Sequence, residues 1–418
     1  MNKSSRLKEF YKKNQIQKLK TIQNFSSLSD KEIALLKNLN SLDYQTANRM
    51  VENVVSTYSL PLGIATNFKI NNKDYLIPMV SEEASVIAAA SNGAKLARLS
   101  DGFFASTSKP IMIGQIQLLG IKNLKKAKEQ IEKNKESIIS FANKQDALLV
   151  KLGGGAEKLQ TKILKTSRGQ MLIVHLLVNV QDAMGANIID TMLEKISPKL
   201  EKLTQGTTLL KIVSNLPIHR IAKASATWKR KTIGEKCIEG ILDAQAFAQA
   251  DPFRCVTHNK GIMNGIDAVA IACGNDFRAI EAGVHCFASL KKTYQPLTKY
   301  YLNEKKDLVG EIELPMPVGT VGGSIKTHPT AKIALKILNI KKSTTLAKIM
   351  ASVGLAQNFA ALKALTTTGI QQGHMKLHSK NIAILAGAKN EKIDLIAKKM
   401  VAQKNISVSK AKELLKTI

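Results

Sequence analysis

The chain has 418 residues, of which 44% are hydrophobic and only 5% are aromatic. This length exceeds what one hydrophobic core usually serves, so two or three domains are expected, and the composition excludes a disordered protein. Lys and Arg number 62 against 32 Asp and Glu, a net charge of +30. Because the lysines are spread along the whole chain, the charge predicts a solvated surface and argues against a nucleic-acid-binding stripe.

Targeting and redox signals are absent from the sequence. The first fifteen residues are charged and lack the apolar centre of a secretory signal, and no run of about 18 apolar residues predicts a membrane span. The four cysteines form no CxxC pair, which favours free thiols over a disulfide or zinc framework. We therefore expect a cytoplasmic protein. These cysteines are Cys237, Cys255, Cys273 and Cys286.

The first 108 residues begin with a polar helical stretch and lead to a strand near residues 75–78. The segment Ser81-Glu82-Glu83-Ala84-Ser85 follows, and an Ala-rich run over residues 86–98 predicts a close-packed helix. An acidic pair just before a helix is favourable, because helix N-termini attract negative charge.

Residues 109–215 predict a self-contained unit. Alternating or β-rich patterns indicate strands over 110–119, 171–180 and 208–214, and 123–145 has the pattern of one amphipathic helix. A helix is expected over 182–203 with Asp182 as its cap. Strands alternating with helices in this way predict a compact α/β unit inserted in a larger domain.

The remainder of the chain is mainly helical by its pattern. Helices are predicted over 233–250, 261–274 and 346–365, and Asn275-Asp276 opens another over 277–290. Residues 315–323 predict a turn-rich loop. From residue 373 onward, short helical patterns with Lys clusters predict a small terminal subdomain.

A dinucleotide site has one weak candidate. No GxGxxG is present, but Val180-Gln-Asp-Ala-Met-Gly-Ala-Asn187 joins a strand to a helix. Gly185 at such a junction lets backbone N–H groups approach a phosphate at the helix N-terminus. A strand-to-helix junction without any ligand is the alternative.

Charged residues among small ones mark two further candidates. Lys260 precedes a glycine, and Asp276, sixteen residues on, is its candidate partner across a helix hairpin; a purely structural ion pair is the alternative. His374 and His378 share a helix face, but no Glu follows as in HExxH. One catalytic and one surface histidine are therefore favoured, and no metal is expected.

Taken together, these segments resemble the 3-hydroxy-3-methylglutaryl-coenzyme A (HMG-CoA) reductases, specifically their soluble bacterial class. The resemblance spans nearly the whole chain, and seven motifs occur in the order of the family. They are Glu52-Asn-Val-Val55, Pro78-Met-Val-Ser-Glu-Glu-Ala-Ser85, Asp182-Ala-Met-Gly-Ala-Asn187, Thr257-His-Asn-Lys-Gly-Ile-Met-Asn-Gly265, Gly274-Asn-Asp276, Gly319-Thr-Val-Gly-Gly323 and Gly373-His-Met375.

The resemblance implies roles for matching residues. The four catalytic residues would be Glu83 (a proton donor, in preference to Glu82), Lys260, Asp276 and His374. Substrate contacts would come from Ser85, Arg254 and Asn264 for the hydroxymethylglutaryl part and from Gln357 for coenzyme A. The cofactor motif would comprise Asp182, Ala183, Met184, Gly185, Ala186 and Asn187, with Gly185 and Asn187 nearest the phosphates.

Two positions depart from the family pattern. NADH-preferring members carry an Asp after the Gly-rich turn of the small domain, where this chain has Lys158. A lysine there would favour a 2′-phosphate, so NADPH is expected, with NADH possible and neighbouring Glu157 as the residue that would reverse the preference. Tyr11 stands where an Arg often contacts coenzyme A, and Lys12 or Lys13 would replace it.

The resemblance also implies an α/β (α+β) architecture with three parts. A large mixed helical and sheet domain (1–108 and 216–368) would bind the acyl-CoA. A small non-Rossmann, ferredoxin-like domain (109–215) would bind the dinucleotide, and a C-terminal helical flap (369–418) would carry His374. Active sites lie at a subunit interface in this family, which implies a homodimer or higher oligomer.

Two alternative functions remain at this stage. The same enzyme run oxidatively would make HMG-CoA from mevalonate with NAD⁺, and the sequence does not decide the direction. A polyanion-binding or nucleic-acid-binding protein would explain the +30 charge, but it would leave Glu83, Asp276 and His374 without a role.

Overall fold

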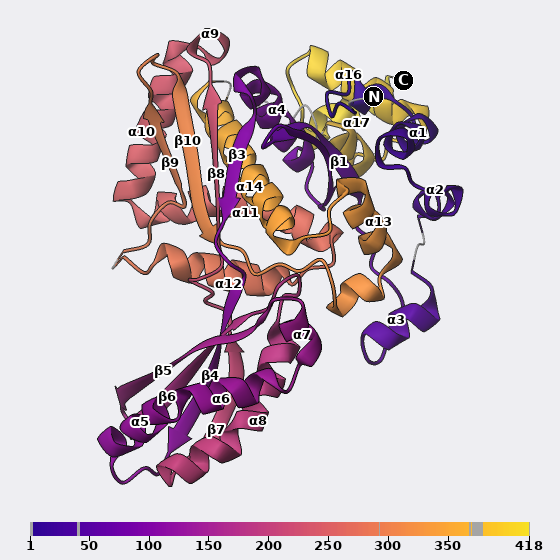
Figure 1. Ribbon diagram of the computed structural model, residues 1–418. Coiled ribbons are helices and arrows are strands. Elements are labelled where there is room, and N and C mark those ends of the chain that lie inside the picture. The colour runs from indigo at the N-terminus through magenta and orange to yellow at the C-terminus, as the bar shows by residue number, and fades with distance from the viewer. Residues whose placement is uncertain (1–2, 40–41, 292, 368, 370–378, 418) are drawn as a thin grey trace.

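The computed structural model describes residues 3–39, 42–291, 293–367, 369 and 379–417. Figure 1 shows a large part built around one sheet and a smaller part with its own sheet below it, and the C-terminal helices α16 and α17 pack on each other. The fold class is mixed α/β, as the sequence predicted.

The large sheet has six strands in the order β2-β1-β3-β8-β10-β9. All neighbouring pairs are antiparallel except β1 and β3, so the sheet is mixed. The strand predicted near 75–78 is confirmed as β2. The bounds are β1 Leu62–Ile70, β2 Lys73–Val80, β3 Phe103–Thr107, β8 Ile221–Trp228, β9 Thr298–Leu302 and β10 Leu308–Pro315.

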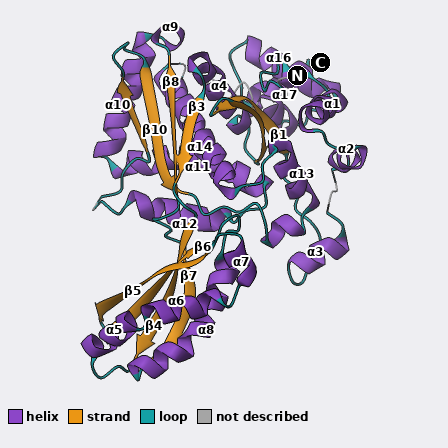
Figure 2. Cartoon of the chain, in the orientation of Figure 1, coloured by secondary structure: helices purple, strands orange, loops and turns teal. Residues whose placement is uncertain are grey.

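Long helices rich in small residues lie against this sheet (Figure 2). The longest, α14 (Ser343–Thr366), is almost wholly buried and packs against α4 (Val86–Ala97) and α11 (Pro252–Ala272). The Trp228 ring of β8 stacks on Phe359 of α14, with centroids 3.9 Å apart. Because the chain has few aromatics, most of this core is aliphatic and alanine-rich.

The other helices of the large part surround this centre. The N-terminal helices pack on α13 through a separate apolar cluster that includes Ile22, Leu28 and Ile337. The remaining helices of the large part are α1 Gln15–Ser26, α2 Asp30–Lys37, α3 Tyr44–Met50, α9 Arg230–Ile233, α10 Glu235–Ala250, α12 Phe277–Ala288 and α13 Pro329–Leu338. Two further helices, α16 Glu391–Ala402 and α17 Val408–Lys416, lie near the C-terminus.

The small part has the element order β-α-β-β-α-β. Its four antiparallel strands lie in the order β5-β6-β4-β7, which is the ferredoxin-like arrangement, and its helices cover one face (Figure 1). The bounds are β4 Ile111–Leu119, α5 Leu124–Lys133, α6 Lys135–Asn143, α7 Ala147–Lys151, β5 Gly155–Thr166, β6 Gly169–Asn179, α8 Ala186–Thr204 and β7 Thr207–Ser214.

Four local predictions differ from the structure. The helix expected over 261–274 begins nine residues earlier, at Pro252, where Asp251 caps it and proline suits the first turn. The helix expected over 123–145 is broken at Asn134, whose side-chain amide donates to the Gln130 carbonyl and competes with the helical pattern. Asp182 is not a helix cap, because α8 begins after Gly185. Strand β5 was not predicted, since its Lys-rich sequence lacks clean alternation.

Buried side chains form separate clusters in the three parts. The large cluster runs from Ala65 to Leu362, the second lies within residues 112–200, and a small third one lies within 383–414. The domain boundaries given above remain predictions. No helix of the described residues is long and apolar enough to cross a bilayer.

The approach of α4 to α14 depends on Gly93. A Cβ built there would lie 2.3 Å from the Ala356 carbonyl oxygen. We expect Gly93→Ala to lower the free energy of unfolding by about 2–3 kcal/mol, because two packed backbones must separate. Gly261→Ala is the matched control, because Gly261 also lies in a helix but a Cβ there would meet nothing within 4 Å. It should raise the free energy of unfolding by about 0.5–1 kcal/mol. Chemical denaturation would measure both, and equal effects would contradict the packing argument.

Candidate active site

Glu83 and Lys260 come together at one side of the large part. Glu83 lies in the loop between β2 and α4, and Lys260 lies in the first half of α11. Lys260 Nζ is 3.8 Å from Glu83 Oε2, with the two side chains 63% and 35% exposed. An ion pair this open is weak in water, so the ammonium remains accessible to a bound substrate.

The predicted substrate residues lie on the elements that carry this pair. Asn264 is one turn after Lys260 on α11, and Gln357 of α14 packs where Gly265 of α11 allows close approach. The Gln357 side chain is buried and its Oε1 has no hydrogen-bond partner. An unpaired buried acceptor costs about 1–3 kcal/mol, so this oxygen is able to accept a hydrogen bond from a donor that reaches it.

Ser85 and Arg254 lie at the starts of the two helices that carry the pair. Ser85 precedes α4 and has a left-handed backbone with φ of 78°. Arg254 lies in the first turn of α11, which is capped by Asp251, and burial lowers the pKa of its guanidinium. Arg254 is thus held by the same helix as Lys260, nearly two turns before it.

Asp276 does not contact Lys260 within the chain. Its carboxylate caps α12 by accepting from the N–H groups of Arg278 and Ala279, and the Arg278 side chain completes its contacts. Its pKa is lowered, since these hydrogen bonds outweigh the opposing effect of burial. The backbone N–H of Asn275, next to Asp276, donates to the carbonyl of Ala270. Ala270 lies ten residues after Lys260 on α11, which is about 15 Å along the helix axis. The hairpin pairing expected from the sequence is therefore not formed.

Asp276 instead lies beside the predicted cofactor motif. The side chain of neighbouring Asn275 both donates to and accepts from the backbone of Gly319. A Cβ on Gly319 would lie 2.8 Å from the Met184 nitrogen, so the 316–322 loop and the 182–187 turn touch through backbone. A short parallel bridge between Ala183 and Val321 continues the contact.

The 182–187 turn presents the N-terminus of α8. Gly185 has φ of 109°, and a Cβ there would lie 2.5 Å from the Val180 side chain, so only glycine fits. No side chain caps α8, and Ala186 and Asn187 form its first turn. Uncapped N–H groups at a helix start suit an anion such as a phosphate.

Asp182 has a structural role that its sequence position did not indicate. Its carboxylate accepts from the Ser343 N–H at the start of α14 and lies 3.3 Å from Lys342 Nζ. Its backbone carbonyl accepts from the Thr320 N–H. Asp182 therefore connects the 182–187 turn to the large part. Its contribution to cofactor binding remains a prediction.

Arg220 is the residue that sequence reasoning missed at this joint. It is 5% exposed, and its guanidinium donates to the carbonyls of Met184, Ala183 and Val318. Burial lowers its pKa to about 10, against the opposing effect of Asp182, so it stays charged at neutral pH. A lone Arg just before a β-rich segment gave no signal, because its partners are backbone atoms distant in sequence.

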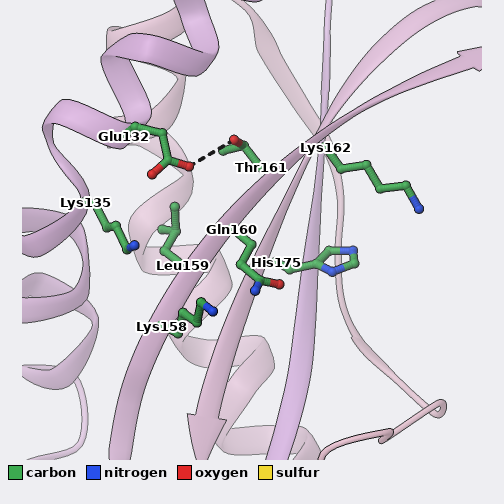
Figure 3. A pocket seen from close by; sticks show the side chains of 8 residues that line it. All are labelled: Glu132, Lys135, Lys158, Leu159, Gln160, Thr161, Lys162 and His175. Carbon is green, nitrogen blue, oxygen red and sulfur yellow. Dashed lines mark hydrogen bonds between the residues drawn. The ribbon is translucent and has the colours of Figure 1, made fainter.

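Lys158 lies on β5, which is an edge strand of the small sheet. It lines a hollow of about 490 Å³ together with Lys135, Lys162 and His175 (Figure 3). Neighbouring Glu157 accepts from the Asn179 side chain and lies 3.6 Å from Lys109. These contacts engage both oxygens of the Glu157 carboxylate.

A buried polar network lies beneath Lys260 and was also missed. His258 Nε2 is 2.6 Å from the Thr298 hydroxyl, which donates to Asn358 Oδ1, and the Tyr300 hydroxyl shares that acceptor. Burial, with the nearby Arg254 charge, lowers the pKa of His258 to about 4. A neutral histidine thus joins α11 to β9 and α14.

His374 and His378 lie outside the described residues, so the structure does not place them. No group of three or more His, Cys, Asp or Glu able to hold a metal ion occurs in the described part of the chain.

Comparisons with known proteins converge on one family. Residues 14–379 match the family described as hydroxymethylglutaryl-coenzyme A reductase. A 3-hydroxy-3-methylglutaryl-coenzyme A reductase from Archaeoglobus fulgidus is 51% identical over 416 residues, covering 99% of this chain and 95% of that protein. A probable reductase of the same kind from Borreliella burgdorferi is 35% identical, covering 91% and 88%.

Solved structures agree. The reductase from Streptococcus pneumoniae superposes with a TM-score of 0.84 at 41% identity, covering 98% of this chain and 99% of that one. A class II reductase structure from the same organism, bound to NADPH in open conformations, gives 0.82, also at 41% identity, covering 97% and 99%.

The chain belongs to the hydroxymethylglutaryl-coenzyme A reductase family. The resemblance read from the seven motifs is confirmed, and with it the activity of an NAD(P)H-dependent oxidoreductase acting on HMG-CoA. The individual site residues stay predictions, because similarity of whole chains does not test them.

A substitution at Arg220 tests how this reductase holds the 182–187 turn in place. Arg220→Met should lower the free energy of unfolding by about 3 kcal/mol and raise KM for NADPH about tenfold, because buried carbonyls lose their donor and the turn loosens. The matched control is Lys223→Met, an exposed cation of strand β8, which begins directly after Arg220, with an expected change within about 0.5 kcal/mol. An unchanged KM for NADPH in Arg220→Met would contradict the positioning role.

Proposed function

We propose that this reductase converts HMG-CoA to mevalonate and free coenzyme A as a homodimer or higher oligomer, with NADPH as the preferred reductant. The observation that carries the proposal is the accessible Lys260 ammonium beside the Glu83 carboxyl group. The catalytic residues proposed are Glu83, Lys260, Asp276 and His374.

Lys260 is suited to stabilise negative charge on the reacting carbonyl oxygen. Reduction of a thioester builds an alkoxide, and an ammonium group fixed on a helix stabilises it most when the charge develops. The helix α11 is held from below by the His258 network, so Lys260 starts from a rigid backbone. Glu83, 3.8 Å away, is within reach to donate a proton to that oxygen.

Release of coenzyme A requires a second proton donor. Collapse of the first reduction product gives a thiolate, and we assign its protonation to His374 by resemblance alone. The freed aldehyde is then reduced, and its oxygen takes a proton from the Glu83 side of the site. The reverse, oxidative reaction with NAD⁺ would use the same residues.

The features around α8 fit a phosphorylated dinucleotide. NADPH supplies hydride for both reduction steps when it is bound. The uncapped start of α8 at Ala186 and Asn187 would hold the pyrophosphate. Lys158, with Lys135 and Lys162 nearby, would pair with the 2′-phosphate (Figure 3).

Coenzyme A has two proposed contacts on the large part. The buried Gln357 Oε1 lacks a donor and would accept one from the substrate. A cavity of about 880 Å³ is lined by Tyr11, Lys18 and the apolar faces of the N-terminal helices. Its size and mixed lining suit the pantetheine chain, with Lys18 available to a phosphate.

The homodimer is supported by the distance between Lys260 and Asp276. One chain holds them about 15 Å apart along α11. If Asp276 is to act on Glu83 or Lys260, it must therefore come from a second copy. Exposed apolar side chains of the large part, such as Phe253 at 84% and Tyr58 at 89%, are available for an interface.

The three-domain division is part of the proposal. Separate hydrophobic clusters support a catalytic domain of 1–108 and 216–368, a cofactor domain of 109–215 and a flap of 369–418. We also propose a cytoplasmic location.

Mixed dimers test the shared site. Lys260→Ala and Asp276→Asn homodimers should each lose NADPH oxidation with HMG-CoA. If Asp276 acts across the interface, mixing the two variants under conditions of subunit exchange should restore about a quarter of wild-type activity, because half of the dimers are mixed and each has one intact site. A mixture that exchanges subunits yet stays inactive would place both residues in one chain's site, and full activity of Lys260→Ala would overturn the catalytic assignment.

Cofactor preference tests Lys158. Lys158→Glu should lower kcat/KM for NADPH by about tenfold or more while leaving NADH little changed, because a 2′-phosphate loses its ion pair. Lys165→Glu, an exposed lysine of β5 outside the hollow, is the matched control and should leave the ratio unchanged. Steady-state kinetics with both reductants would measure it, and a wild type that strongly prefers NADH would contradict the assignment.

A further inference from the structure

The cavity of about 880 Å³ on the large part lies beside the loop that carries Glu83. Its wall includes Val80 and Ile87, which flank that loop. Helices α1 and α2 pack on α13, and all three contribute lining side chains (Figure 1). The cavity therefore begins within a few residues of the proposed proton donor.

His328, directly before α13, is a polar group in this largely apolar wall. His328 and Ile337 both line the cavity, and they are nine residues apart, or about 14 Å along the axis of α13. The hollow therefore follows most of the length of this helix. His328 has no role in the reaction or in the cofactor contacts proposed above.

The backbone of His328 is fixed against the loop that leads to Asp276. Its N–H donates to the Ser324 carbonyl at 2.8 Å, and the Ser324 hydroxyl donates to the Gly274 carbonyl at 2.7 Å. A Cβ on Gly274 would lie 3.1 Å from the Ala331 side chain, so the start of α13 packs closely on this loop. The imidazole is therefore carried by a well-anchored segment.

The two ring nitrogens of His328 differ in their surroundings. Nδ1 is buried without a hydrogen-bond partner among the described residues. Nε2 also has no partner in that part of the chain, and it is not enclosed, so it is the nitrogen that a ligand can reach.

The surroundings also indicate where the imidazole carries its proton. Burial lowers the pKa of His328, so the ring is neutral near pH 7 and has one N–H group. An enclosed N–H without an acceptor is rare and costly, so the proton is expected on Nε2. His328 thus presents a neutral hydrogen-bond donor to the cavity.

We propose that His328 is a specificity-determining residue whose Nε2–H group donates to an amide carbonyl of the pantetheine chain. Pantetheine carries two amide groups in an otherwise apolar chain, and each carbonyl needs a donor when it leaves water. Lys18, with its full charge, suits a phosphate, whereas the neutral His328 suits an uncharged carbonyl. The inference rests on the proposed function, because it adds a residue to the proposed coenzyme A site.

Variants of His328 test the donor. His328→Phe keeps an aromatic ring without nitrogens, so Kd for free coenzyme A and KM for HMG-CoA should rise about three- to tenfold, with kcat little changed, because one hydrogen bond is lost. His328→Gln keeps an N–H donor near the position of Nε2 and should remain within about twofold of wild type. Calorimetry would measure Kd, and steady-state kinetics would measure KM.

A substrate without pantetheine separates binding from folding. Mevaldehyde has no thioester, so its reduction in the absence of coenzyme A should be equally fast in wild type and His328→Phe. His219→Phe, at an exposed histidine outside the cavity, is the matched control and should leave all these values unchanged. Equal losses with mevaldehyde and HMG-CoA would reveal a damaged fold and would overturn the specificity role.

The two proposals can fail separately. Full activity of Lys260→Ala would overturn the proposed catalytic assignment without affecting the binding of coenzyme A. If the wild type reduced HMG-CoA and bound coenzyme A, but His328→Phe bound it equally well, only the role of His328 would be wrong. A His328→Gln variant as weak as His328→Phe would also contradict the assigned donor.

Discussion

The buried Arg220 guanidinium is the interaction on which the arrangement of this enzyme depends. It lies where the small part returns to the large sheet, and it donates to backbone carbonyls from the cofactor turn and from the 316–322 loop. Asp182 closes the same joint from the other side through α14. A buried charge satisfied by fixed carbonyls is costly to disturb, so the 182–187 turn has a defined position relative to the helices of the large part.

Helix α11 sets the distances in the active site. It carries Lys260 in its first half and leads to Asp276 past its end, so this straight helix separates the two proposed catalytic residues. A second subunit resolves that separation in the proposed dimer.

The two parts of the chain divide the chemistry by their architecture. The large part presents Lys260 and Gln357 on helices packed with small residues, where Gly93 and Gly265 permit close approach, and Glu83 on the loop before α4. The ferredoxin-like part presents a helix N-terminus and a lysine-lined hollow, both suited to phosphates. Much of the +30 charge is lysine on exposed surfaces, and an anionic substrate and cofactor would be attracted by it.

The sequence by itself determined the family, the fold class and most helices and strands. Seven ordered motifs and strong local patterns can be recognised without knowing which distant residues meet in space. It predicted β6, α8 and α12 closely, and it named Glu83 and Lys260, which the structure brings together. Only the tertiary structure decided the rest. Arg220 and His258 act through partners far away in the chain, and no local pattern encodes such contacts. The pairing of Lys260 with Asp276 was wrong within one chain, because a spacing of sixteen residues says nothing of the straight helix that holds the two apart.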